Sequence, residues 1–235
     1  MSGTTSGSRR IMAAVTTAGI GLSLLFPSSA RAAESTCTIA GYGPNKVVMG
    51  ASEVDTTYTV QRSGCAGYTW SLDIPGVTWA DQAEPMVTFV PAFARNVNAG
   101  AHAGTVSMLD SHGDGPAKDI RFSLLRRATF GSTFNASPEP VKKGKKITLT
   151  ATLKRINWKS ADVQNYIAFT KVKVDVQFKA DGESGYSTVR TATSGAGGKV
   201  STTVKVTKTG RWRLVSAGTS TTATATSGSD AVKVR

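Results

Sequence analysis

The feature that most limits how this chain can fold is a strict alternation of apolar and polar residues over short segments. In Lys171–Phe178, valine or phenylalanine occupies every second position, and lysine, aspartate or glutamine stands between them. Successive side chains of a β-strand point to opposite faces, so one face of this segment is buried and the other meets water. No segment after residue 32 has the sustained 3.6-residue spacing of an amphipathic helix, and the sequence therefore predicts an all-β protein.

Similar segments recur along the chain and are separated by turns rich in glycine. In the second half the predicted strands are Lys146–Leu153, Lys171–Phe178, Tyr186–Thr193, Lys199–Val206, Arg211–Ala217 and Ala231–Arg235. In the first half they are Lys46–Met49, Asp55–Gln61, Gly67–Leu72, Met86–Val90, Gly104–Leu109 and Ile120–Leu125. Short strands at this spacing are typical of antiparallel β-sandwiches, and Val106, Met108, Phe122 and Leu124 are predicted core residues.

Residues 1–32 are predicted to be a signal peptide. Arg9 and Arg10 precede the uncharged apolar run Ile11–Phe26, and the stretch ends in Ala30-Arg31-Ala32, a small-residue cleavage pattern. The run is short for a membrane span. We therefore expect a secreted, extracellular protein without a stable membrane anchor.

Charge divides the rest of the chain into two unlike parts. The whole chain has a formal charge of +13, but residues 33–128 hold 7 basic and 9 acidic residues, a net charge of −2. Residues 129–235 hold 18 basic and 6 acidic residues, a net charge of +12. Such asymmetry favours two domains with different surfaces, predicted here as 33–128 (the first half) and 129–235 (the second half).

The chain has two cysteines, Cys37 and Cys65. In an exported protein they are expected to form a disulfide, which would tie the N-terminal strand to a neighbouring strand or turn. Two cysteines and two histidines also argue against a cysteine-rich zinc site or a multi-histidine metalloenzyme.

The second half resembles a known group of proteins. The residues that carry the resemblance are the segment PEPVKKGKKITLTATLKR, Asn157-Trp158, Val172–Phe178, Gly210–Leu214 and Gly228–Asp230. It is similar to the C-terminal immunoglobulin-like domain of many secreted actinobacterial proteins, some of which are labelled calcium-binding. The resemblance implies two immunoglobulin-like β-sandwiches in tandem after the signal peptide, and it supplies no catalytic residues.

Lysines form the densest candidate site. Lys142, Lys143, Lys145 and Lys146 surround Gly144, and Lys171 and Lys173 lie on the polar face of the alternating strand. One interpretation is a solvated surface that resists aggregation. The other is a patch that binds an anionic polymer of the cell envelope. No nucleic-acid-binding motif is present, so only nonspecific binding to nucleic acid would be expected.

The segment Asp110–Gly115 resembles a cation-binding loop in part. Asp110 and Asp114 could offer oxygens to calcium, but His112 and Arg121 stand where an EF-hand has an oxygen ligand and its bidentate glutamate. The alternative is a hairpin turn between two strands. Calcium is the one cofactor that the sequence suggests, and only weakly.

Acidic residues near tryptophan raise the question of a glycan-active enzyme. Asp73, Asp81 and Glu84 lie close in sequence to Trp70 and Trp79, a combination found in sugar sites. Their surroundings also fit loops and core packing, and no G-x-S-x-G motif is present. We therefore predict that the protein is not an enzyme.

The leading hypothesis is a non-catalytic secreted two-domain protein, binding or structural, that associates with the cell wall through its basic second half. A first alternative is a secreted inhibitor of an extracellular hydrolase, which would bind a secreted protein through Asp110–Gly115 or through Asn157–Thr170, predicted to be the longest loop. A second is a calcium-dependent binding module, and a third is a glycan-active enzyme.

Overall fold

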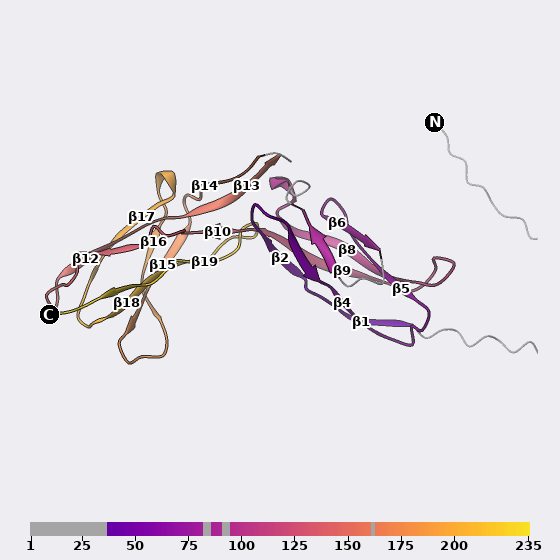
Figure 1. Cartoon of the computed structure of the whole chain (residues 1–235), viewed down its shortest axis with the longest axis horizontal. Helices are drawn as coiled ribbons and strands as arrows, with labels where there is room; N and C mark the ends of the chain where they lie inside the picture. The colour runs from indigo at the N-terminus through magenta and orange to yellow at the C-terminus, as the bar shows by residue number, and fades with distance from the viewer. Residues whose placement is uncertain (1–36, 82–85, 91–94, 161–162) are drawn as a thin grey trace, which may run out of the picture. The chain divides into compact units, whose positions relative to one another are not determined.

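The computed structural model describes residues 37–81, 86–90, 95–160 and 163–235. In these ranges the regular structure is β-strand, apart from two 3-10 turns at η1 (Asn96–Asn98) and η2 (Ala196–Gly198), so the predicted all-β fold is confirmed (Figure 1). The predicted signal peptide, residues 1–32, lies outside the described residues and stays a prediction. Among the residues described, no helix is long and apolar enough to cross a membrane.

Strands β1 to β9 of the first half form three sheets. A five-stranded sheet has the order β2-β9-β8-β5-β6, and two strand pairs, β1-β4 and β3-β7, accompany it. β2 runs parallel to β9, whereas the other pairs are antiparallel, so the expected antiparallel architecture has one parallel edge. The bounds are β1 (Thr38–Gly43), β2 (Lys46–Met49), β3 (Val54–Thr57), β4 (Thr59–Ser63), β5 (Thr69–Ile74), β6 (Thr78–Asp81), β7 (Met86–Phe89), β8 (Gly100–Leu109) and β9 (Ala117–Arg126).

The long β8–β9 hairpin supplies the centre of the first core. Val106 and Met108 of β8, and Phe122 and Leu124 of β9, are at most 1% exposed, which confirms the prediction for these four residues. The ring of Phe122 stacks on that of Phe89 with 5.5 Å between centroids. Burial of each such side chain contributes about 1.5–3 kcal/mol, and this is what holds the strand pairs against the five-stranded sheet.

The predicted single strand Asp55–Gln61 is wrong in one respect, because it is interrupted at Tyr58. Up to Thr57 the chain pairs with β7, and from Thr59 it pairs with β1. Tyr58 is 1% exposed, and its ring centroid lies 6.2 Å from that of Trp70. The chain changes partner at this residue, where the aromatic side chain enters the core.

We expect Tyr58 to make the protein sensitive to alkali. Burial, and then the nearby Tyr42, raise the pKa of Tyr58 from 10.0 to about 12. The unfolded chain releases this proton from about pH 10, whereas the folded chain holds it to about pH 12, so the free energy of unfolding falls by about 1 kcal/mol at pH 11. In the Tyr58→Phe variant, the free energy of unfolding measured with urea at pH 8 and pH 11 should not show this loss.

The same variant removes a buried hydroxyl that has no hydrogen-bond partner among the described residues. Its stability at pH 8 should therefore equal or exceed that of the parent, because a buried polar group without a partner costs about 1–3 kcal/mol. The matched control is Tyr68→Phe, at a half-buried tyrosine. A loss of stability at pH 11 in Tyr58→Phe as large as in the parent would contradict the assignment.

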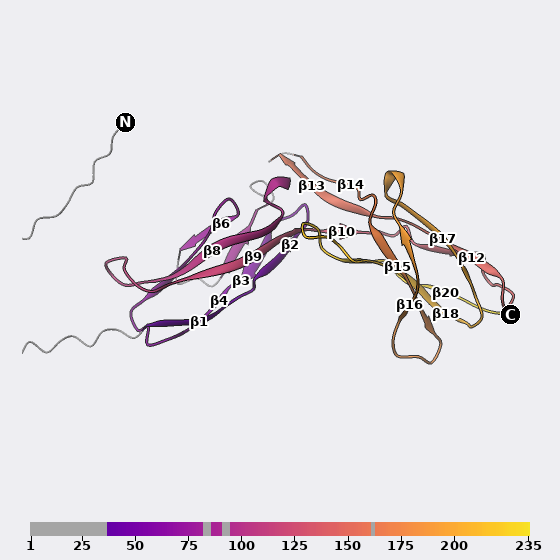
Figure 2. The same cartoon turned by 180° about the vertical axis from the view of Figure 1, so that it is seen from behind.

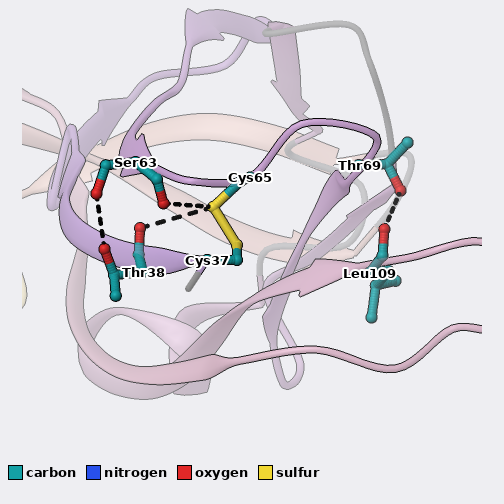
Figure 3. Close-up of a disulfide and its surroundings, with 6 residues drawn as sticks. All are labelled: Cys37, Thr38, Ser63, Cys65, Thr69 and Leu109. Atoms are coloured by element: carbon teal, nitrogen blue, oxygen red, sulfur yellow. Dashed lines mark hydrogen bonds between the residues drawn. A yellow bond between two sulfur atoms is a disulfide. The ribbon is translucent and has the colours of Figure 1, made fainter. Parts of the chain in front are cut away.

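The predicted disulfide between Cys37 and Cys65 is confirmed, and Figure 3 shows its surroundings. Cys37 directly precedes β1, and Cys65 follows β4 by two residues. Thr38 pairs with Ser63 in the strand register, and their hydroxyl oxygens lie 2.8 Å apart. The bridge thus closes the end of the β1–β4 pair, as expected for a link between the N-terminal strand and its neighbour.

Strands β10 to β20 of the second half also form three sheets. Their orders are β11-β12-β17, β10-β13-β14 and β16-β15-β18-β19, and β20 also pairs with β18. The bounds are β10 (Ala128–Thr129), β11 (Asn135–Ser137), β12 (Lys146–Thr152), β13 (Lys154–Ser160), β14 (Val163–Ala168), β15 (Lys173–Ala180), β16 (Ser187–Thr193), β17 (Lys199–Lys205), β18 (Gly210–Ser216), β19 (Ala225–Thr226) and β20 (Asp230–Val232).

Alternation decides which side chains form the second core. Val174 and Val176 of β15 are fully buried, and Leu214 of β18 is 0% exposed. Trp212, two residues before, is 3% exposed and contacts the ring of Phe178 with 4.6 Å between centroids. The predicted strands of this half are confirmed, with shifts of at most three residues at their ends.

The prediction that Asn157–Thr170 forms a loop is wrong. Most of it belongs to the β13–β14 hairpin, in which Ile156 pairs with Tyr166. Ile156 and Trp158 are 0% and 1% exposed, and both pack in the core of the first half. Trp158 of β13 is therefore part of the hydrophobic core built by strands β1 to β9.

The described residues fall within one compact unit, Ser35–Arg235, that contains two hydrophobic cores. The predicted boundary between residues 128 and 129 stays a prediction. A cut at that point would separate the first core from Ile156 and Trp158.

Candidate anion-binding surface

The six predicted lysines are all exposed, and four of them cluster before and at the start of β12. Lys142, Lys143 and Lys145 stand in a tight turn in which Gly144 has a φ of 80°, a value that glycine adopts without strain. The amide of Gly144 donates to the carbonyl of Val206 at 2.7 Å, which fixes the turn against the end of β17. The lysine run is therefore held in place by backbone hydrogen bonds, and its side chains face solvent.

Lys171 and Lys173 lie at the opposite end of the second half. The amide of Lys171 donates to the carbonyl of Ser194 at 2.7 Å. Ser194 is close to the turn η2, in which the carbonyl of Gly198 accepts from the amide of Leu153. Leu153 follows the far end of β12, about 24 Å from Lys146 at 3.4 Å per residue. The six predicted residues therefore do not form one patch.

Other cations that are distant in sequence join the lysine run instead. Lys205 pairs with Lys146 in the register of β12 and β17. The carbonyls of Lys233 and Arg235 accept from the amides of Val141 and Lys143, at 2.9 and 3.3 Å. The "cationic end" of the second half consists of Lys142, Lys143, Lys145, Lys146, Lys205, Lys233 and Arg235.

These charges have no acidic partners in the structure as described. The one ion pair among the described residues joins His112 to Asp110 at 3.7 Å, in the first half. The second half, residues 129–235, therefore carries its net charge of +12 with no ion pair among its described residues. A field of this kind attracts anions over a Debye length, about 8–10 Å at physiological salt.

A smaller group of cations surrounds Tyr186 on the solvent face of β15 and β18. The guanidinium carbon of Arg213 lies 3.9 Å from the centroid of the Tyr186 ring, and the ammonium of Lys179 lies 5.5 Å from it. Arg213 also donates through Nε to Oε1 of Gln177 at 2.8 Å. Arg211 is exposed while Trp212 is buried, in keeping with the alternation of outward and inward residues along β18.

Two further arginines, the buried Arg126 and the half-buried Arg155, lie where β9, β10 and β13 meet, and sequence reasoning missed them. Arg126 is 8% exposed, and one of its Nη atoms donates to Oδ1 of Asn96 at 3.1 Å. Burial lowers the pKa of Arg126, and the charge of Arg155 adds to this shift. The guanidinium of Arg155 lies 4.7 Å from the ring centroid of Phe169. The sequence contains one signal for the burial of Arg126. It continues the alternation of inward residues along β9, which are Ile120, Phe122, Leu124 and Arg126.

The segment Asp110–Gly115 forms the turn of the β8–β9 hairpin. Oδ1 of Asp110 accepts from the amides of His112 and Asp114 at 2.8 and 3.0 Å. The hydrogen bonds from Asp114 and His112 lower the pKa of Asp110. No described group of three or more histidine, cysteine or acidic side chains could hold a metal ion, so Asp110 and Asp114 would have to bind calcium with little help. Calcium binding stays a prediction.

An open hollow of about 990 Å³ lies on the solvent face of the five-stranded sheet. Ala101, Ala103 and Thr105 of β8 form its floor, and Asp73 and Asp119 stand on either side of Thr105 in the register. Asp73 and Asp119 are thus separated by strand β8, and Asp73 stands opposite Trp79 in the register of β5 and β6. The side chain of Asp81, and Glu84 as a whole, lie outside what the structure describes.

Comparisons with known proteins add little to this picture. Neither a protein-family model nor a curated protein matches the chain. Among solved structures, the D00-D0 domain of intimin is similar at 18% identity and a TM-score of 0.29, over 83% of this chain and 98% of that one. An I-band fragment of titin is similar at 10% identity and a TM-score of 0.29, over 85% and 65% of the two chains.

Immunoglobulin domains 1-5 of Sidekick-1 are similar at 10% identity and a TM-score of 0.26, over 85% of this chain and 40% of that chain. At these identities and scores the likenesses assign no function.

Proposed function

We propose that this protein is a non-catalytic secreted binding protein whose second half attaches it to an anionic polymer of the cell envelope. The observation that carries the proposal is the uncompensated charge of residues 129–235, which hold 18 basic and 6 acidic residues and contain no described ion pair. Seven of these cations gather at the cationic end.

The arrangement suits a polymer better than a single small anion. Lysines in the turn before β12 and at the ends of β17 and β20 present separate charges that a chain of repeated negative groups can meet in succession. Each contact with an exposed lysine is weak, so affinity comes from their number and falls as salt rises. Exposed lysine and arginine side chains bind oxyanions through their charge and their N–H donors.

Neutralising the turn should weaken binding to purified cell walls strongly. A variant with Lys142→Gln, Lys143→Gln and Lys145→Gln loses three exposed charges without touching the core. If each lysine contributes about 1 kcal/mol, as basic residues do near anionic surfaces, the affinity falls roughly a hundredfold at low salt. Cosedimentation with walls at two salt concentrations measures both the loss and its salt dependence.

The matched control removes three exposed arginines from the first half, by Arg62→Gln, Arg95→Gln and Arg121→Gln. It changes the net charge equally and should leave sedimentation within about twofold. Equal losses in both variants would mean that only total charge matters, and binding that ignores salt would exclude an electrostatic surface. Capture of an extracellular hydrolase without wall binding would favour the inhibitor hypothesis.

A further inference from the structure

A cleft of about 410 Å³ opens between β16 and β17, the edge strands of the sheets β16-β15-β18-β19 and β11-β12-β17. Figures 1 and 2 show these strands side by side, and Nη1 of Arg190 on β16 donates to the carbonyl of Thr203 on β17 at 3.2 Å. Its volume is within the range of about 300–1,000 Å³ that ligand pockets have. Of the nine residues that line it, three are cations and none is acidic.

Lys146 and Lys205 form one wall of this cleft and face each other in the strand register. Like charges directly opposite one another destabilise a strand pair. In the absence of a ligand this repulsion is opposed only by water and ions, whereas an oxyanion between the two ammonium groups would remove it. The wall is thus suited to an anion.

Arg190 stands on the other wall, and a β-bulge sets its position. The register of β15 and β16 shifts between Val176–Arg190 and Gln177–Thr188, so Val189 is the extra residue. Bulges turn side chains away from the regular pleat. Here the guanidinium is held across the gap to β17, and Val189 is 51% exposed beside it.

The floor of the cleft is aromatic and contains a donor without an acceptor. Phe178 and Trp212 both line the cleft, and Trp212 is 3% exposed. Nε1 of Trp212 has no hydrogen-bond partner among the described residues. A buried N–H without an acceptor costs free energy, so an oxygen that approached the indole from the cleft would stabilise it.

We propose that this cleft is a subsite for one acidic unit of the polymer, a sugar or polyol that carries a carboxylate or a phosphodiester. Its oxyanion is bound by Lys146, Lys205 and Arg190, and its carbon skeleton packs on Val189 and Phe178. The inference rests on the proposed function, and it adds a specific site to what would otherwise be a diffuse electrostatic attraction.

The test uses residues 33–235 and short probes that are too small to span the cationic end. The probes are a trimer of galacturonate, which carries carboxylates, and a trimer of glycerol phosphate, which carries phosphodiesters. With one of them, the indole N–H signal of Trp212 should show the largest shift among the four tryptophans in an NMR titration, assigned with the Trp212→Phe variant. The probe that produces the shift identifies the anionic group.

Arg190→Gln should weaken binding of that trimer about tenfold, the effect of losing one charge-assisted hydrogen bond. The matched control is Arg211→Gln, at an exposed arginine that does not line the cleft, and it should stay within twofold. Lys205→Gln provides a second variant if Arg190→Gln fails to fold. It should weaken binding while raising the thermal midpoint of the free protein by about 1–3 °C, because it removes a like-charge pair.

Failure of the subsite differs from failure of the proposed function. If polygalacturonate or polyglycerol phosphate binds, but neither trimer shifts the Trp212 signal and the Arg190 and Arg211 variants behave alike, the subsite is wrong and the polymer-binding function stands. If neither the polymers nor purified walls bind, both are wrong.

Discussion

Replacing Trp158 by alanine should lower the free energy of unfolding by about 3–5 kcal/mol, the cost of deleting a fully buried aromatic side chain. Trp158 is 1% exposed and packs in the core built by strands β1 to β9, although it belongs to β13. The largest effect on the first core should therefore come from a residue that the charge pattern assigns to the second half.

The size of this effect follows from what surrounds the indole. Nε1 of Trp158 donates to the carbonyl of Gly50 at 3.1 Å, and the backbone amide donates to Oδ1 of Asn96 at 3.0 Å. The same Asn96 donates through Nδ2 to Oδ1 of Asn157 at 2.6 Å. Truncation leaves a cavity and takes the donor from a buried carbonyl, and both effects are unfavourable.

Urea unfolding of residues 33–235, followed by far-ultraviolet circular dichroism, measures the change. Trp158→Phe keeps most of the apolar contact but loses the N–H, so it should fall between the parent and Trp158→Ala. The matched control is Lys159→Ala, at the exposed neighbour on the same hairpin, with an expected change within about 0.5 kcal/mol. A loss below 1 kcal/mol for Trp158→Ala would mean that the hairpin is not part of the first core.

The hairpin that carries Trp158 shows where sequence reasoning stopped. Lys154–Ser160 alternates correctly, with Ile156 and Trp158 inward, but Asn157 and the polar residues beyond it are typical of loops. Strand formation there depends on pairing with β10 and on the Asn96 contacts, which are remote in sequence. Tertiary contacts overrode local preference, as is common for strands.

The candidate site was predictable in charge but not in geometry. Counting residues located the positive half and the lysine run around Gly144. The two cations that share the cleft with Lys146 could not be found in this way. The register of β12 with β17 places Lys205 there, and the bulge in β16 places Arg190 there. Periodicity says which face a residue takes, but not which strand lies beside it.

The second large effect concerns the disulfide. Replacing Cys37 and Cys65 by alanine should lower the free energy of unfolding by about 3.5 kcal/mol, which is the loop-closure entropy of a bridge across 28 positions. β1 pairs only with β4 in the described sheets, so the bridge is the covalent link that keeps the first strand in place. Hydrogen exchange at the paired amides of β1 should rise more than exchange in β8 and β9.

Three measurements separate the bridge from the contacts around it. Mass spectrometry of the non-reduced parent should show two hydrogens fewer than the dithiol form. Reduction of the parent should reproduce the stability of the double alanine variant. Thr38→Val, which removes the hydroxyl contact with Ser63 and keeps the branched side chain, should cost about 0.5–1.5 kcal/mol. If the double variant unfolds at the same urea concentration as the oxidised parent, the bridge does not restrict the unfolded chain, and the strand pairing of β1 alone accounts for its order.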